Sequence, residues 1–292
     1  MKNKILVTGY KGFIGSNLFA ALPEEQRVGI DLKDGEDIID QLPDILVDTV
    51  FHFAAQPRVE YSVLNPSYTL KHNVLGTSRV LEWAKNHGAK RVVFSSSSAI
   101  YGDGKGPNSP YGLHKLMSEM ECKLYSELYG LDVVCLRYFN VYAEDQEYGG
   151  AYSTVISAWM EMIRDNNPLR IDGDGEQTRD YVHVEDVVSA NLFCANYEGD
   201  FSGACFDVGT GEAISLNKIR EFVEKRYNVD WHHATERSGD VKHTLADIGP
   251  LQSLGWQPKI KIAEGLKRCF MDKQNISKYR ELQSPAKDRG VL

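Results

Sequence analysis

The sequence predicts a doubly wound α/β fold, in which a parallel β-sheet is covered by helices on both faces. Short apolar runs alternate with amphipathic helical segments over the first half of the chain. The first apolar run leads directly into a glycine-rich turn that opens a helix. With 292 residues, of which 42% are hydrophobic and 25% charged, the chain can bury a large core.

The elements of the first half follow one another as strands and helices in turn. Continuous apolar runs predict strands, because a strand covered on both faces needs apolar side chains throughout. These strands are expected at Ile5–Thr8, Val28–Asp31, Thr49–Ala54, Arg91–Ser95 and Asp132–Arg137. Apolar residues at helical spacing predict helices at Phe13–Leu22, Pro66–His87 and Tyr111–Tyr129. Strands separated by helices in this way pair in parallel.

After about residue 140 the alternation becomes less regular. Helices are predicted at Tyr152–Arg164, from Glu185, from Ser215 and twice after Ala246, with polar loops between them. We therefore expect residues 1–140 to form the first domain. Residues 141–292 are expected to form a smaller, interleaved region with segments that return to that domain.

Composition narrows the class of protein. The net charge of −8 and the absence of any Lys/Arg run argue against nucleic-acid and anionic-membrane partners. No stretch approaches the about 18 apolar residues of a membrane span, and none resembles a signal peptide. The five cysteines form no CxxC pair and predict reduced thiols in a cytoplasmic protein. The acidic loop Asp172–Asp180 lacks the glycine and glutamate of a calcium loop, so no metal site is expected.

The first chemical motif is the sequence TGYKGFIG. Its residues Gly9, Gly12 and Gly15 would let backbone N–H groups approach a diphosphate, and the helix N-terminus favours negative charge. Asp31, at the end of the next predicted strand, can accept hydrogen bonds from ribose hydroxyls and would repel a 2′-phosphate. The motif therefore predicts a dinucleotide site that prefers NAD to NADP.

The second motif is the serine-rich strand end SSSSAIYG, followed by YGLHK. Tyr111 and Lys115 lie four residues apart on a predicted helix and therefore share a face. The pKa of a free tyrosine is about 10, and a neighbouring lysine cation and an oxidised nicotinamide would both favour the phenolate. A serine from the strand end can bridge a sugar hydroxyl and the tyrosine. The group predicts redox chemistry on that hydroxyl with Tyr111 as the base.

Together these motifs resemble the extended short-chain dehydrogenases/reductases of the nucleotide-sugar epimerase/dehydratase family, and most of all the UDP-glucose and UDP-N-acetylglucosamine 4-epimerases. The resemblance runs from Lys4 to Gly265 and includes HFAAQPRVEYS, NVLGT, LRYFNVY, GDGEQTRDYVHVEDV, FDVGTGEAIS, RSGDVKHTLADI and LGWQP. It implies a Rossmann-type fold, tightly bound NAD, a UDP-sugar substrate and the catalytic residues Ser97, Tyr111 and Lys115. Two segments depart from relatives: the loop between Tyr101 and Tyr111 and the stretch Asp31–Asp48 are both short.

The resemblance also assigns binding residues. Those implied for the cofactor are Gly9, Gly12, Phe13, Ile14, Gly15, Asp31, Asp37, Ile38, Phe53, Ala54, Ala55, Asn73, Ser95, Tyr111, Lys115 and Tyr138. Those implied for the substrate are Ser97, Asn140, Tyr152, Val155, Arg179, Arg237, Asp240 and Thr244. Among the latter, the two arginines match diphosphate-binding positions, where a planar guanidinium can hold phosphate oxygens.

The residues after Ser97 bear on the reaction. The 4,6-dehydratases of the family carry an Asp-Glu pair there, because elimination of water needs an added acid and base. Here the positions are Ser98 and Ala99, which cannot exchange a proton usefully, so we expect a 4-epimerase. Tyr111 would take the proton of the sugar 4-hydroxyl while hydride passes from carbon 4 to NAD, and the 4-keto sugar would turn before hydride returns.

Substrate range and alternatives also follow from the resemblance. Thr244 stands where a bulky tyrosine excludes N-acetyl groups, so N-acetylhexosamines are expected substrates beside UDP-glucose and UDP-galactose. A uronate is disfavoured, because Glu144, Asp145 and Glu147 would repel a carboxylate. The alternatives are a UDP-glucuronate epimerase, a nucleotide-sugar 4-reductase, which would use NADPH and is disfavoured by Asp31, and a non-enzymatic dinucleotide-binding protein.

The resemblance extends to assembly. The helices near Leu70–His87 and Tyr111–Tyr129 resemble the family's four-helix dimer contact, so a homodimer is expected.

Overall fold

The computed structural model describes residues 4–146, 154–235 and 241–270. Its centre is a six-stranded sheet in which every pairing is parallel, with the strand order β2-β1-β3-β4-β5-β10. The strands are β1 (Ile5–Thr8), β2 (Arg27–Ile30), β3 (Thr49–His52), β4 (Arg91–Ser97), β5 (Asp132–Tyr138) and β10 (Ala204–Val208). The predicted Rossmann-type fold class is confirmed.

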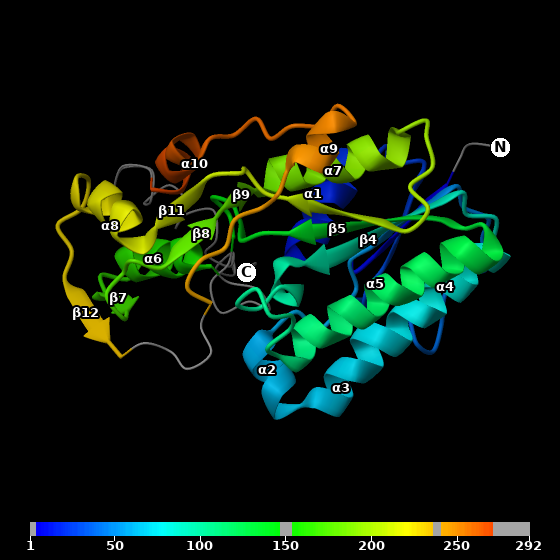
Figure 1. The fold of residues 1–292 in the computed structure, drawn as a ribbon, viewed down its shortest axis with the longest axis horizontal. Helices are drawn as coiled ribbons and strands as arrows, with labels where there is room; N and C mark the ends of the chain where they lie inside the picture. Colours follow the sequence, from blue (N-terminus) through cyan, green and yellow to red (C-terminus); the bar gives the residue numbers. More distant parts are fainter. Residues whose placement is uncertain (1–3, 147–153, 236–240, 271–292) are drawn as a thin grey trace, which may run out of the picture.

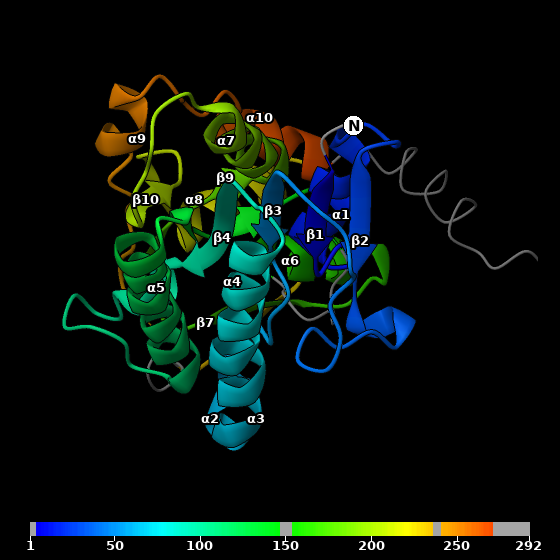
Figure 2. The same ribbon diagram turned by 90° about the vertical axis from the view of Figure 1, so that its right-hand side faces the viewer.

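Helices cover both faces of this sheet, as the two views show (Figures 1 and 2). One face packs against α1 (Phe13–Ala21), α7 (Val184–Asn196) and α9 (Gly249–Ser253), and the other against α4 (Gly76–Asn86) and α5 (Pro110–Tyr129). Successive strand residues alternate between the two cores, so Val7 faces the first and Leu6 the second. Both cores are apolar because the sheet is buried on both sides.

The predicted helix Pro66–His87 is present but not uniform. It consists of α3 (Pro66–Leu70), a π turn (Lys71–Leu75) and α4. A separate short helix, α2 (Val59–Leu64), precedes it and was not predicted. Asn65 separates α2 from α3 because the residue before a proline disfavours helical dihedrals, and its φ and ψ are −133° and 59°.

Strand β2 forms one edge of the sheet. The short stretch between Asp31 and Asp48 follows it and adds no further strand there. All residues of this stretch are described, and the only regular element in it is a 3-10 turn (Leu32–Asp34). The chain then crosses to β3 on the other side of β1. This reversal between β1 and β3 is the switch point at which doubly wound sheets bind ligands.

The second half forms a smaller lobe with its own core around Trp159, Ile171 and Ile219. Its helices are α6 (Val155–Arg164), α8 (Leu216–Glu224) and α10 (Ile262–Cys269). Its strands form three separate pairs: β6 (Val141–Tyr142) with β9 (Val182–His183), β7 (Leu169–Asp172) with β12 (Trp231–Ala234), and β8 (Thr178–Asp180) with β11 (Ala213–Ser215). The chain returns to the main sheet through α7, β10 and α9. The domain division at residue 140 stays a prediction.

Most helix ends in this half lie where the sequence predicts them. Thr154 caps α6, which therefore starts later than the predicted Tyr152, a residue outside the described ranges. Ser215 caps α8 through the N–H of Lys218. None of the helices in the described ranges combines the length and hydropathy needed to cross a bilayer.

Candidate functional site

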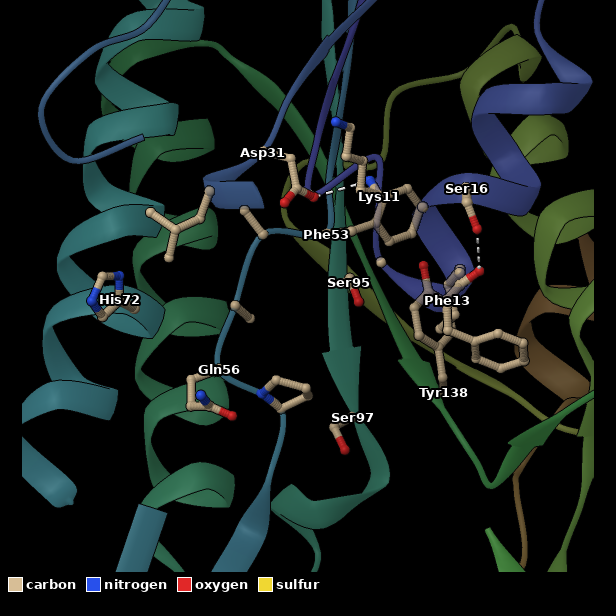
Figure 3. A pocket seen from close by; sticks show the side chains of 18 of the residues that line it. Lys11, Phe13, Ser16, Asp31, Phe53, Gln56, His72, Ser95, Ser97 and Tyr138 are labelled. Atoms are coloured by element: carbon tan, nitrogen blue, oxygen red, sulfur yellow. Dashed lines mark hydrogen bonds between the residues drawn. The ribbon is translucent and has the colours of Figure 1, made fainter. Parts of the chain in front are cut away.

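A cavity of about 760 Å³ opens at the carboxyl ends of β1, β3, β4 and β5 (Figure 3). The loop after β1, the segment after β3 and the end of β4 all contribute residues to its wall. The cavity therefore lies at the switch point, where the sequence motifs place the cofactor.

The glycine loop is shaped for close approach to a ligand. Gly9 has a φ of +72°, and a Cβ there would lie 2.7 Å from the backbone nitrogen of Ala54. A Cβ on Gly15 would collide with the carbonyl oxygen of Gly9. Helix α1 starts after Gly12 with no side-chain cap, so its first N–H groups stay available to an anion. These features fit the diphosphate of a dinucleotide.

Asp31 is fixed at the edge of the cavity. One of its carboxylate oxygens accepts a hydrogen bond from the backbone N–H of Lys11 at 2.9 Å (Figure 3). The other accepts a hydrogen bond from the backbone N–H of Lys33, also at 2.9 Å. A carboxylate can accept more than one bond at each oxygen, so Asp31 can still receive ribose hydroxyls. Its position fits NAD and opposes a 2′-phosphate.

Lys115 is buried and its ammonium group is directed toward the end of β4. Nζ donates a hydrogen bond to the carbonyl oxygen of Ser95 at 2.5 Å and lies 4.9 Å from the ring centroid of Phe94. Burial lowers the pKa of Lys115 to about 8, and the charge of Glu119 one turn along the helix opposes that shift. The side chain is therefore predominantly charged near neutral pH.

Tyr111 lines the same wall and is also buried. Burial raises the pKa of Tyr111, and a hydrogen bond with Ser97 lowers it in part. Burial is the larger influence on Tyr111 in the protein without its cofactor, and the Lys115 ammonium is hydrogen-bonded to Ser95; that Lys115 and an oxidised nicotinamide favour the phenolate stays a prediction.

A polar network lies behind the serines of β4. Glu119 of α5 accepts a hydrogen bond from Ser96 at 2.5 Å and two from Arg137 of β5. Arg137 also donates to the hydroxyl of Tyr101, which donates to Asp207 of β10. The network ties α5 to three strands and fixes the strand end between Ser95 and Ser97.

Nearly all residues predicted for the cofactor lie on the cavity wall. The exception is Asn73, which lies one layer behind it and holds the segment after β3. Its Oδ1 accepts from the N–H of Gln56 at 2.7 Å, and its Nδ2 donates to the carbonyl oxygen of Gln56 at 3.0 Å. Asn73 therefore fixes the backbone of Gln56, which lines the cavity.

The predicted substrate residues are only partly brought together. Ser97 and Asn140 line the cavity. Thr244 lies beside Asn140, with Nδ2 of the amide 3.4 Å from Oγ1 of the threonine, and Arg179 is held by the carbonyl oxygens of Thr178 and Lys242. Val155 is the first residue of α6 and does not line the cavity. Tyr152, Arg237 and Asp240 lie outside the described residues.

Several cavity residues were not predicted from the sequence: Lys11, Ser16, Asn17, Leu32, Lys33, Glu36, Gln56, Pro57, Tyr68, His72, Ser96, Ser98, Val141, Asp145 and Gln146. Most neighbour a predicted residue, so the motifs themselves were the available signal. Tyr68 and His72 are different, since nothing in a helical pattern tells which polar residues face a ligand. In the described ranges, no cluster of three or more His, Cys, Asp or Glu residues is arranged to hold a metal ion.

Fold and site define the class of protein: a dinucleotide-binding enzyme whose serine, tyrosine and lysine meet at the switch point of a doubly wound sheet. A model of the NAD dependent epimerase/dehydratase family matches residues 5–209. The chain therefore belongs to the NAD-dependent epimerase/dehydratase family, as its motifs predict, and its cofactor is NAD.

Individual relatives are similar along nearly the whole chain. A putative UDP-glucose 4-epimerase of Methanocaldococcus jannaschii is 35% identical, over 90% of this chain and 96% of the relative. The UDP-N-acetylglucosamine 4-epimerase of Methanobrevibacter ruminantium, solved with UDP-N-acetylmuramic acid, is 30% identical with a TM-score of 0.84, over 97% of this chain and 100% of the other. MoeE5, solved with UDP-glucose and NAD, is 32% identical with a TM-score of 0.82 over the same shares. MoeE5 has also been solved with UDP-glucuronic acid and NAD.

Proposed function

We propose that the protein is an NAD-dependent 4-epimerase that interconverts UDP-gluco and UDP-galacto hexoses through a transient 4-keto sugar. The observation that carries the proposal is the group Ser97, Tyr111 and Lys115 beside the cofactor loop, with Ser98 and Ala99 where a dehydratase has its acids. An epimerase needs no added acid, because the base that takes the proton can return it. Relatives named as UDP-sugar 4-epimerases support the same activity.

The protein's residues divide the work at the 4-hydroxyl. The Oγ atom of Ser97 accepts the N–H of Ala99 at 3.2 Å, so its own hydrogen can be directed to the sugar oxygen or to Tyr111. Tyr111 takes the 4-hydroxyl proton and later returns it. Because burial raises the pKa of Tyr111, the phenolate requires positive charge nearby, which the Lys115 ammonium supplies. NAD, which the glycine loop and Asp31 would hold, would supply further positive charge and the hydride acceptor for carbon 4.

The substrate is expected to be a neutral sugar nucleotide. Glu144 is held at 2.9 Å by Nε2 of His183, and Arg268 lies 3.8 Å away, so its charge is largely compensated. Asp145 is exposed and lines the cavity, with no ion-pair partner among the described residues. Asp145 is therefore the group that would repel a uronate, whereas MoeE5 shows that relatives of this fold can bind one.

The acetamido group is expected to fit as well. Thr244 is small, and its Oγ1 lies 3.4 Å from Nδ2 of Asn140, which lines the cavity. UDP-N-acetylglucosamine and UDP-N-acetylgalactosamine are accordingly included among the proposed substrates. The residues proposed to hold the UDP moiety are Asn140, Tyr152, Val155, Arg179, Arg237 and Asp240.

A conversion panel tests the proposal. Purified protein is incubated with UDP-glucose, UDP-N-acetylglucosamine or UDP-glucuronate, with no added cofactor, and the products are followed by proton NMR. Conversion of the first two to their galacto forms is expected, with slow or no turnover of the uronate. A strict requirement for added NADPH would instead identify a 4-reductase, and turnover of the uronate alone a UDP-glucuronate epimerase.

We further propose that the protein is a cytoplasmic homodimer built on a four-helix contact. Helices α4 and α5 lie side by side on one face (Figure 2). The outer side of α5 exposes Leu113, Met117, Met120, Leu124 and Leu128. Their spacing of three and four residues forms one apolar stripe, of the kind that marks a helix–helix interface. The five cysteines are free, which agrees with a reducing compartment.

A further inference from the structure

We propose that His72 binds the adenine ring of NAD and closes the adenine end of the cavity. The inference rests on the NAD dependence of the proposed function. It adds a binding residue that neither the glycine loop nor the tyrosine–lysine pair predicts.

The cavity has two chemically different ends. Ser97 and Tyr111 mark the end where a hydroxyl reacts, and the glycine loop occupies the middle. Figure 3 shows Asp31, which is suited to a ribose, at the opposite end of the site from Ser97. Asp37 and Ile38 also line the cavity, and Ile38 lies against Gly76, one turn after His72. A dinucleotide with its diphosphate at the glycine loop would therefore place its adenine against this last part of the wall.

At the adenine end, few protein elements border the cavity on the side of β2. Between Asp31 and Asp48 the chain forms only one 3-10 turn, so β2 has no neighbouring strand on its outer side. Helix α3 and the π turn supply the opposite wall, through Tyr68 and His72. In Figure 3, His72 lies with Gln56 on the helix side of the site, away from Phe13 and Tyr138.

The π turn Lys71–Leu75 explains why His72 faces the cavity. Its next residue, Asn73, is turned into the protein, where its side chain is fixed by Gln56 and its carbonyl oxygen accepts Thr77 Oγ1 at 2.6 Å and Ser118 Oγ at 3.0 Å. One turn later, Gly76 packs on Ile38, since a Cβ there would lie 3.0 Å from Cδ1. The helix is thereby held against the adenine end, and π turns are frequent at functional sites.

The chemistry of His72 suits adenine. Burial is the main cause that lowers the pKa of His72; the charge of Lys71 also lowers it, while Asp37 and Asp40 raise it. The neutral imidazole that results has one donor and one acceptor nitrogen, and adenine offers an amino donor and ring acceptors. The ring of Tyr68, with its centroid 4.2 Å from that of His72, packs against the imidazole. The aromatic rings also provide a surface for a planar base.

The experiment compares ligands with and without adenine. Full-length protein freed of nucleotide is titrated calorimetrically with NAD, AMP and nicotinamide mononucleotide, as wild type and as His72→Ala. His87→Ala is the matched control, because His87 ends the same helix and lies outside the cavity. We expect His72→Ala to weaken NAD and AMP binding by about fivefold to tenfold and to leave nicotinamide mononucleotide unchanged, as the loss of one ring contact or hydrogen bond implies.

The outcomes are distinct. NAD and AMP affinities within twofold of wild type in His72→Ala, or an equal loss for all three ligands, would overturn the role of His72 alone. A wild-type protein that binds neither NAD nor AMP would overturn the proposed function as well. If the alanine variant does not fold, His72→Leu keeps apolar volume and removes the ring nitrogens, and the same selective loss for NAD and AMP is expected.

Discussion

Arg137 and Glu119 form a two-point ion pair directly behind the serines of β4, with N–O distances of 2.9 and 2.7 Å. Glu119 is 4% exposed, and its other neighbour is the hydroxyl of Ser96. Lys115 and Glu119 stand one turn apart on α5. The pair therefore sets the position of the helix that carries Tyr111 and Lys115 against the strand that carries Ser97.

Removing Glu119 is expected to destabilise the fold strongly. In Glu119→Ala, Arg137 keeps its charge without its carboxylate partner, so the free energy of unfolding should fall by about 3 kcal/mol. Glu127→Ala is the control on the same helix, since Glu127 is exposed and 3.8 Å from Lys123, and its loss should cost under about 0.5 kcal/mol. Urea denaturation measures both. Equal losses in the two variants would show that the buried pair contributes nothing special.

Lys115 should give the stability a defined pH dependence. Its pKa is about 8 in the folded protein and about 10.5 when unfolded, so between these values the unfolded chain binds more protons and stability rises with pH. The full contribution is about 3 kcal/mol, gained from pH 8 upward. Lys115→Met should lack this rise, which urea denaturation of both proteins at pH 7 and pH 10 can measure. Parallel changes in the two proteins would mean that Lys115 is not desolvated.

The site contains features that local sequence patterns predict and contacts that they do not. The glycine loop, Asp31 and the tyrosine–lysine pair were predicted because each is a local pattern whose spacing sets its geometry. The partner of Lys115 was not, since Ser95 O reaches it only when β4 and α5 pack together. The ion pair of Glu119 with Arg137 joins a helix and a strand in the same way, and no local pattern encodes it.

The interrupted helix shows a second limit of the sequence. Apolar spacing predicts one helix over Pro66–His87, and it does so correctly in outline. The π turn at Lys71–Leu75 depends on what Asn73 meets, namely the backbone of Gln56 and the hydroxyls of Thr77 and Ser118. The resemblance assigns Asn73 to the cofactor, and this stays a prediction; in the structure its side chain holds Gln56, which lines the cavity.

Thr244 should control the size of the sugar that is accepted. Its hydroxyl lies 3.4 Å from the amide of Asn140, which lines the cavity, and we expect a tyrosine there to narrow the space for the sugar. We expect Thr244→Tyr to lower kcat/KM for UDP-N-acetylglucosamine at least tenfold and to spare UDP-glucose, because only the larger sugar meets the added ring. Thr244→Ser is the conservative control. Unchanged turnover of UDP-N-acetylglucosamine in Thr244→Tyr would remove this residue as the gate.

The apolar stripe on α5 should be the dimer contact. Charges at its centre, in the double variant Met120→Glu and Leu124→Glu, should convert a dimer to a monomer, because buried unpaired carboxylates oppose association. Leu46→Glu is the control, since Leu46 is exposed but lies outside the stripe. Light scattering with size exclusion gives the mass of each. A monomeric wild type, or a double variant that stays dimeric, would contradict the assignment.

The fate of the hydrogen on carbon 4 tests the central claim most directly. UDP-glucose labelled with deuterium at carbon 4 is given to the purified protein without added cofactor, and the product is examined by NMR and mass spectrometry. Removal and return of one hydride within the site predicts UDP-galactose that retains the deuterium at carbon 4. Product that has lost the label, or formation of galactose only with added reduced cofactor, would contradict a 4-epimerase of this kind.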